Sequence, residues 1–154
     1  MFVYNFDFKG KKVIFPILSF IFAIICIFAM VSIQSKSFDT ATCDEIGEYS
    51  LIAEDSKEQC NFLRTFKIEP IENTAQAQNI TIPIKFNSIY EEYNSLQKKI
   101  GLDLNKYRGK NAKKITYTLK NSKARYAVLL MYEDKIIGAH LTNGEYGQKN
   151  MPLI

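Results

Sequence analysis

Few side chains in this sequence of 154 residues could act as an acid, a base or a nucleophile. The one histidine, His140, lies late in the last expected strand, where an imidazole could serve as a general base. A half-exposed structural residue is the favoured interpretation of His140. Two cysteines, Cys43 and Cys60, lie in the same part of the chain as His140, the part after residue 33. One histidine and two cysteines do not give the ligand spacing of a zinc site. No local motif supports a Cys–His hydrolase either. We therefore predict no catalytic residue, no metal ligands and no cofactor.

Adjacent carboxylates occur twice in places where paired acids could do chemistry. Glu91 and Glu92 lie in the first turn of an expected helix, where acids interact favourably with the helix dipole. Glu133 and Asp134 lie in an expected hairpin turn. The sequence also lacks the GxSxG, phosphate-loop and HExxH motifs. These patterns favour a binding protein, and the alternative is a cell-envelope hydrolase whose site is not visible in the sequence.

Residues 13–33 form an uncharged, strongly apolar block of 21 residues. As a helix this block would span about 31 Å, close to the thickness of a bilayer core. It predicts an uncleaved, single-pass transmembrane helix with the lipid bilayer as its partner. Lys9, Lys11 and Lys12 precede the block, so the positive-inside rule places residues 1–12 in the cytoplasm and the rest of the chain outside.

The remaining chain divides into a polar stalk, residues 34–45, and an extracytoplasmic domain, residues 46–154. A nucleic-acid partner is not expected for a domain outside the cytoplasm. Export permits a disulfide between Cys43 and Cys60. Two free thiols are equally compatible with the sequence.

The sequence of this domain predicts an α+β fold. One helix is expected to begin at Asp55 or Ser56 and to bury Phe62, Leu63 and Phe66. Together with the second helix described below, it is expected to cover one face of a mainly antiparallel sheet. The sheet is expected to end in a three-strand meander, because turn residues separate three apolar runs. Strands are predicted over residues 46–53, 79–87, 113–120, 125–132 and 136–141.

The second expected helix begins at Ser88 with a capping box and ends before Gly101. Four side chains at helical spacing predict its buried face: Ile89, Tyr93, Leu96 and Ile100. On this assignment Asn94 and Gln97 point outward and have no structural role.

Basic residues dominate the part of the chain that follows this helix. Residues 98–125 contain ten Lys and Arg side chains and one acid, Asp103. Such a segment could contact anionic lipid headgroups, an anionic wall polymer or the acidic half of the same domain, and a solvated face is the favoured interpretation. An envelope protein is a further candidate partner. The candidate interaction surface consists of Asn94, Gln97, Lys106, Arg108, Lys110 and Lys113.

Five short motifs stand out in the domain: IPIKF at 82–86, YNSLQ at 93–97, GLDLNKYRGK at 101–110, LLMY at 129–132 and KIIG at 135–138. Together they resemble a known bacterial family, the one catalogued as domain of unknown function 4830. The resemblance implies a membrane anchor followed by one small extracytoplasmic domain, mostly in clostridial Gram-positive bacteria, and it implies no catalytic residues. The chain departs from the family pattern at residues 67–68 and 139–140.

Overall fold

The computed structural model describes residues 11–36, 39–120, 122–145 and 147–154. The chain forms two compact units, Met1–Ser37 and Phe38–Ile154. We refer to the second unit as the domain.

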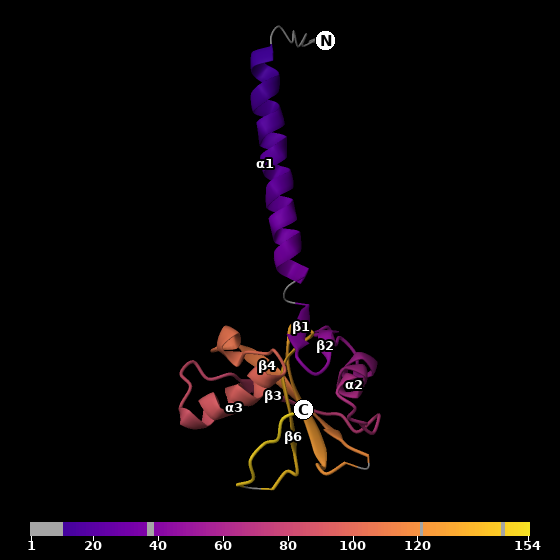
Figure 1. The fold of residues 1–154 in the computed structure, drawn as a ribbon. Helices are drawn as coiled ribbons and strands as arrows, with labels where there is room; N and C mark the ends of the chain where they lie inside the picture. The colour runs from indigo at the N-terminus through magenta and orange to yellow at the C-terminus, as the bar shows by residue number, and fades with distance from the viewer. Residues whose placement is uncertain (1–10, 37–38, 121, 146) are drawn as a thin grey trace, which may run out of the picture. The chain divides into compact units, whose positions relative to one another are not determined.

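The first unit contains one continuous helix, α1 (Lys11–Lys36), which is drawn in indigo in Figure 1. Among the helices that the structure describes, none combines the length and the apolar sequence needed to cross a bilayer. In the predicted span, the side chains of residues 13–16 and 31–33 lie outside the described residues. The same holds for all side chains of the predicted cytoplasmic segment, residues 1–12. The transmembrane helix over residues 13–33 stays a prediction.

The domain opens with a hairpin, of which the sequence predicted only the second strand, within residues 46–53. Strand β1 (Thr40–Cys43) pairs antiparallel with β2 (Gly47–Ser50). Residues 40–43 were expected to be stalk because they are polar overall. Ala41 and Cys43 alternate with exposed neighbours and are buried, so this short strand closes one side of the core.

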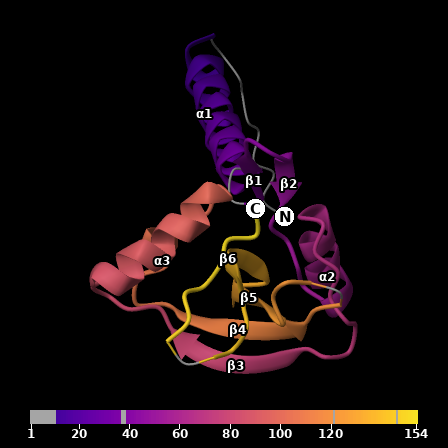
Figure 2. The same ribbon diagram turned by 60° about the horizontal axis from the view of Figure 1, so that its bottom comes forward.

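Four strands form the main sheet: β3 (Gln76–Thr81), β4 (Asn111–Thr118), β5 (Tyr126–Tyr132) and β6 (Lys135–Thr142). Their order is β3-β4-β5-β6 and every pair is antiparallel, which confirms the predicted C-terminal meander. Figure 2 shows β3 at the outer edge of this sheet. Strand β3 ends earlier than predicted, before Pro83, because proline cannot donate to a β-ladder.

The helices of the domain lie on opposite faces of the sheet, so the expectation that they share one face is wrong. Helix α2 (Ser56–Thr65) packs with side chains such as Leu129 of β5. Helix α3 (Ser88–Lys99) and the 3₁₀ helix η1 (Leu104–Tyr107) lie over Leu130 on the opposite face. Successive residues of a strand face opposite sides, so β5 supplies both contacts.

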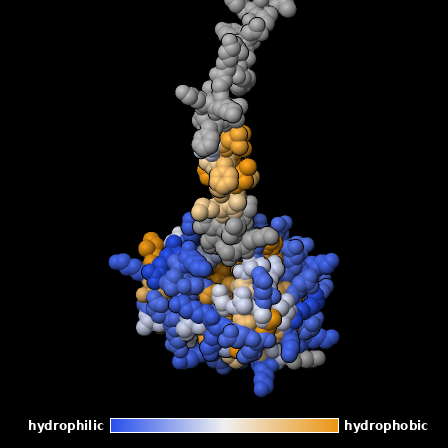
Figure 3. All heavy atoms as spheres, turned by 45° about the horizontal axis from the view of Figure 1, so that its top comes forward, coloured by the Kyte–Doolittle hydropathy of each residue, from blue (hydrophilic) through white to orange (hydrophobic). Residues whose placement is uncertain are grey.

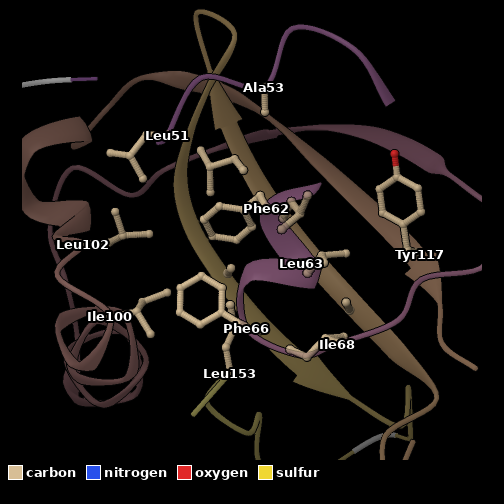
Figure 4. Close-up of a cluster of buried hydrophobic side chains, with 14 of the residues drawn as sticks. Leu51, Ala53, Phe62, Leu63, Phe66, Ile68, Ile100, Leu102, Tyr117 and Leu153 are labelled. Carbon is tan, nitrogen blue, oxygen red and sulfur yellow. The ribbon is translucent and has the colours of Figure 1, made fainter. Parts of the chain in front are cut away.

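The larger hydrophobic cluster lies between α2, the first hairpin and the sheet (Figure 4). Phe66 is its centre, with ring centroids 5.1 Å from both Phe62 and Tyr49. The Tyr49 hydroxyl donates a hydrogen bond to the carbonyl of Ile100 and thereby joins the hairpin to the end of α3. Cluster members labelled in Figure 4 are Leu51, Ala53, Phe62, Leu63, Phe66, Ile68, Ile100, Leu102, Tyr117 and Leu153.

Cys43 and Cys60 are free thiols in the structure, and both are buried in this cluster. Of the disulfide and the two free thiols that the sequence left as alternatives, the structure has the two free thiols. Burial raises the pKa of the Cys60 thiol, which disfavours its reactive thiolate form.

Candidate functional site

Asn94 and Gln97 do not form part of an exposed surface, because the structure buries both, with exposed fractions of 1% and 0%. The Asn94 amide oxygen accepts a hydrogen bond of 2.8 Å from the backbone N–H of Leu104. Its amide nitrogen donates to Asp103 Oδ1, also at 2.8 Å. Asp103 in turn accepts from the backbone N–H of Asn105. Asn94 therefore holds the 3₁₀ turn against α3.

Gln97 has a similar structural role at the edge of the sheet. Its side-chain oxygen Oε1 accepts a hydrogen bond of 2.7 Å from the backbone N–H of Ala139 in β6. A buried backbone donor without a partner is costly, so an amide at position 97 is favoured over an apolar side chain. Both amides belong to the scaffold, which corrects the expectation that they contact a partner.

The buried face of α3 is rotated from the predicted one as a result. Ile89 was expected to be buried and is 73% exposed. Asn87, rather than Ser88, caps the helix, and its side chain accepts from the backbone N–H of Tyr90 at 2.9 Å. Tyr93 and Ile100 do lie inward, as predicted.

His140 is also buried, so its interpretation as a half-exposed residue is wrong. Its Nδ1 lies 2.8 Å from the hydroxyl of Tyr93, and the two rings meet edge to face. Burial, with a smaller effect of the charge on Lys114, lowers the pKa of His140 to about 4. The imidazole is therefore neutral near pH 7 and enclosed under α3.

The carboxylate pairs have structural roles as well. Glu91 forms an ion pair with Arg108, and Glu92 forms one with Lys149. Glu133 and Asp134 form the β5–β6 turn with positive φ angles of 47° and 59°. Within the described residues, no cluster of three or more His, Cys, Asp or Glu side chains could hold a metal ion.

The structure gathers exposed isoleucine and basic side chains around half-buried aromatic rings where β3 leads into α3. We call this surface the aromatic–basic patch, and it consists of Ile84, Phe86, Ile89, Tyr90, Arg108 and Lys110. Much of the surface seen in Figure 3 is hydrophilic, and one of its small hydrophobic areas lies at the left, the side on which Figure 1 shows α3.

Contacts between two chain segments hold this patch together. The Arg108 guanidinium carbon lies 4.5 Å from the centre of the Phe86 ring, and the Phe86 and Tyr90 rings are 5.1 Å apart. Gly109 packs so closely on Ile84 that an added Cβ would lie 3.2 Å from Ile84 Cγ1. The sequence indicated these two segments as motifs but could not indicate that they meet.

Lys110 extends the patch toward the hairpin of β5 and β6. Its Nζ lies 5.8 Å from the centre of the Tyr132 ring, which packs on Tyr107 at 5.6 Å. Burial is the main reason that the pKa of Tyr107 is raised, so this hydroxyl stays neutral. Lys106 is exposed on the same 3₁₀ turn.

The basic segment of residues 98–125 does not form one surface. Arg108 and Lys110 join the patch, whereas Lys120 and Lys123 follow the far end of β4 and line a cleft with Lys67. The single basic surface expected from the sequence is thus divided among separate parts of the domain.

Lys113, the last residue of the predicted interaction surface, lies in a groove on the α2 face of the sheet. The groove has a volume of about 730 Å³, and it was not predicted. Asn79, Thr81 and Asn111 line it from β3 and β4 beside Lys113. Its other polar lining residues are Glu54, Gln59, Tyr132, Glu133 and Asp134.

These features define a small α+β domain with a four-stranded antiparallel sheet, two exposed candidate binding surfaces and a buried polar network. The family model described as Domain of unknown function (DUF4830) matches residues 62–141, which is more than half of the chain. The chain belongs to this family, as its motifs indicated. Comparisons with curated proteins and with solved structures gave no match.

Proposed function

We propose that this protein is a membrane-anchored binding module of the cell envelope, and that its domain contacts the anionic surface of a bilayer through the aromatic–basic patch. The observation that carries the proposal is the exposure of Ile84 and Ile89, at 74% and 73%. The other exposed large hydrophobic side chains described in the domain, Ile52 and Ile71, are only about half as exposed.

Three kinds of side chain in the patch suit a lipid surface. Isoleucine is stabilised by leaving water, aromatic rings favour the headgroup zone, and cations are attracted to anionic headgroups. Each Lys or Arg near such a surface contributes about 1 kcal/mol, so Arg108 and Lys110 would add a modest, salt-sensitive attraction. The exposed isoleucines favour lipid over a soluble anionic polymer, because a polymer gives them no apolar environment.

The anchor is the second part of the proposal. Residues 13–33 carry no charge, and they lie within the 26-residue helix α1. We place residues 1–12 in the cytoplasm and the domain outside, as the lysines before residue 13 predict. A tether would keep the domain close to the bilayer and raise its effective concentration there, so weak contacts of the patch would suffice.

Vesicle sedimentation of a fragment, residues 38–154, tests the patch separately from the anchor. The described buried hydrophobic residues lie between Ala41 and Leu153, so the fragment keeps its core. We expect it to bind vesicles rich in phosphatidylglycerol and to bind phosphatidylcholine vesicles much less, with binding lost at high salt.

Matched variants locate the contact. The pair Ile84→Ser and Ile89→Ser should reduce binding about tenfold or more, since each removes apolar area from the contact. Ile71→Ser, at an exposed isoleucine outside the patch, is the control. Equal binding to neutral and anionic vesicles, or equal loss in the control, would argue against the proposal. Competition by soluble polyphosphate that is independent of both isoleucines would instead favour a polymer ligand.

Membrane extraction of the full chain tests the anchor. The full-length protein should stay with the membrane fraction in alkaline carbonate, and a chain lacking residues 13–33 should not. Release of the full-length protein by carbonate would contradict the anchor.

A further inference from the structure

The main sheet has two edges, and the chain covers one of them. Strand β6 is the covered edge, because three of its outward backbone N–H groups have partners. Ile136 donates to the carbonyl of Leu51 at 2.8 Å, and Leu141 donates to the carbonyl of Met151 at 2.9 Å. Ala139 donates to the Gln97 side chain. The edge is thereby closed to further strand pairing.

Strand β3 is the open edge. The N–H of Ile82 donates to the carbonyl of Lys110, so residue 82 faces β4. Hydrogen-bonding residues alternate along an antiparallel strand, so Gln78 and Ile80 also face β4. Ala77, Asn79 and Thr81 then direct their N–H and C=O groups away from the sheet. Within the described residues, these outward groups form no hydrogen bond with another backbone group.

The sequence of β3 lacks the usual protection of an open edge. Proteins block such edges with lysine, proline, bulges or a covering segment. Strand β3 reads QAQNIT, has no charged residue or proline, and pairs with β4 over its whole length without a register shift. Its side chains are exposed apart from that of Ile80, which is half-buried. This edge is therefore accessible to one more strand.

The groove lies directly beside the open edge. Asn79 and Thr81 have outward backbone groups, and their side chains line the groove together with Lys113. Alternate side chains of a strand added to β3 would lie on this same face. The groove volume of about 730 Å³ lies within the range of ligand pockets, about 300–1,000 Å³. It offers room for side chains longer than those of β3.

We infer that β3 binds an extended peptide segment of a partner protein by strand addition, and that the segment places a basic side chain in the groove. Main-chain hydrogen bonds would supply affinity, and the groove would supply specificity. The groove wall carries three carboxylates, Glu54, Glu133 and Asp134, against the single cation Lys113. A lysine or arginine at an alternate position of the peptide complements this charge.

A second copy of the chain suits this edge less well. The β3 strand of another copy would bring alanine, asparagine and threonine to the groove face, and these side chains are short and uncharged. The acidic groove therefore indicates a different, basic segment as the occupant.

Selection from a phage-displayed library of random twelve-residue peptides tests the inference, with the full chain in detergent micelles as the target. We expect enrichment of peptides that alternate β-forming residues with lysine or arginine. Asn79→Pro removes one outward N–H without removing a bond to β4, and edge strands tolerate proline at such a position. This variant should lose at least tenfold in affinity for the selected peptide. Gln78→Ala, on the opposite face, should not.

Synthetic N-methylated copies of the selected peptide separate strand addition from other binding modes. Methylation of alternate amides that face β3 should abolish binding, and methylation of the amides on the other edge should preserve it. The double variant Glu54→Gln, Glu133→Gln should weaken binding only of peptides with the basic residue. The inference is overturned if no selected peptide binds the wild-type chain more tightly than the Asn79→Pro variant. It is also overturned if both methylation patterns reduce binding equally, or if the chain dimerises through β3 instead. Thermal melts of each variant check that the fold is intact.

Discussion

Helix α2 and helix α3 pack on opposite faces of one sheet. Helix α2 buries Phe62 and Leu63 together with one amide, Gln59, whereas the buried residues within α3 are two amides. Helix α2 mainly meets the hydrophobic side chains of the first hairpin and the sheet, and its Gln59 pairs with the Tyr117 hydroxyl and the carbonyl of Ala53. Helix α3 meets the backbone of a 3₁₀ turn and of an edge strand, and both offer N–H donors that need acceptors. Apolar periodicity therefore identifies a buried helix face where the neighbours are side chains and fails where they are backbone donors.

The largest expected effect distinguishes apolar positions of the two helices. Leu63→Ala in α2 removes a fully buried side chain and should lower the free energy of unfolding by about 3 kcal/mol. Ile89→Ala in α3 should change it by less than about 0.5 kcal/mol, because that side chain is exposed. Chemical denaturation measures both. A loss of similar size at Ile89 would show that the helix face predicted from the sequence is the buried one.

A second comparison concerns the amides of α3. Asn94→Leu keeps the branched shape of the side chain, but it leaves the N–H of Leu104 without its acceptor and removes one of the two hydrogen bonds to Asp103 Oδ1. We expect a loss of about 2 kcal/mol. Asn61→Leu, at an exposed position of α2, is the control and should be nearly neutral. Greater stability of Asn94→Leu than of the wild type would contradict a structural role for the amide.

The α3 face should also make the domain sensitive to acid. The pKa of His140 is lowered to about 4 in the folded state, whereas the unfolded chain binds this proton near its ordinary pKa of 6.5. Protonation thus favours unfolding as the pH falls from about 6.5 to about 4. Between pH 7 and pH 5 this histidine should cost about 2 kcal/mol of stability.

The variant His140→Gln isolates that contribution from those of the carboxylates. We would measure the free energy of unfolding of both proteins as a function of pH. Subtracting the profile of the variant from that of the wild type should leave the loss of about 2 kcal/mol between pH 7 and pH 5. Parallel profiles of the two proteins would mean that His140 titrates normally in the folded state.

The smallest expected effect concerns the helix caps. Asp55→Ala in α2 and Asn87→Ala in α3 each remove a side-chain acceptor for a backbone N–H and should cost about 1 kcal/mol. Ser88→Ala should cost little, since Asn87 is the cap in the structure. A larger loss of stability at Ser88 than at Asn87 would show that Ser88 caps α3, as the sequence predicted.

Much of the fold follows from local patterns in the sequence. Apolar runs separated by turns predicted the meander of β4, β5 and β6, and Gly101 was correctly identified as a helix end, with φ of 77°. Side-chain alternation predicted the position of β3 only in part, because Pro83 ends the ladder. Strand β1 was missed because it lies in a segment that is polar overall, whereas its partner β2 lies within the predicted strand 46–53.

The candidate site could be predicted less well than the fold. Arg108 and Lys110 were identified from charge alone and do lie in an exposed patch. Their contacts with Phe86 and Tyr132 join segments that are distant in sequence, and no periodicity contains that information. The groove and the open edge of β3 arise from strand order, which is likewise a property of the whole domain.

The first hairpin has a mechanical consequence. Gly101 lies so close to the carbonyl of Thr42 that no larger residue fits there, and Leu51 donates to the carbonyl of Asp39 at the open end of the hairpin. The chain enters the domain at this open end, so tension applied at residue 38 would load the Asp39–Leu51 bond first and then each strand pair in turn. The hairpin would therefore open one strand pair at a time before the main sheet is loaded.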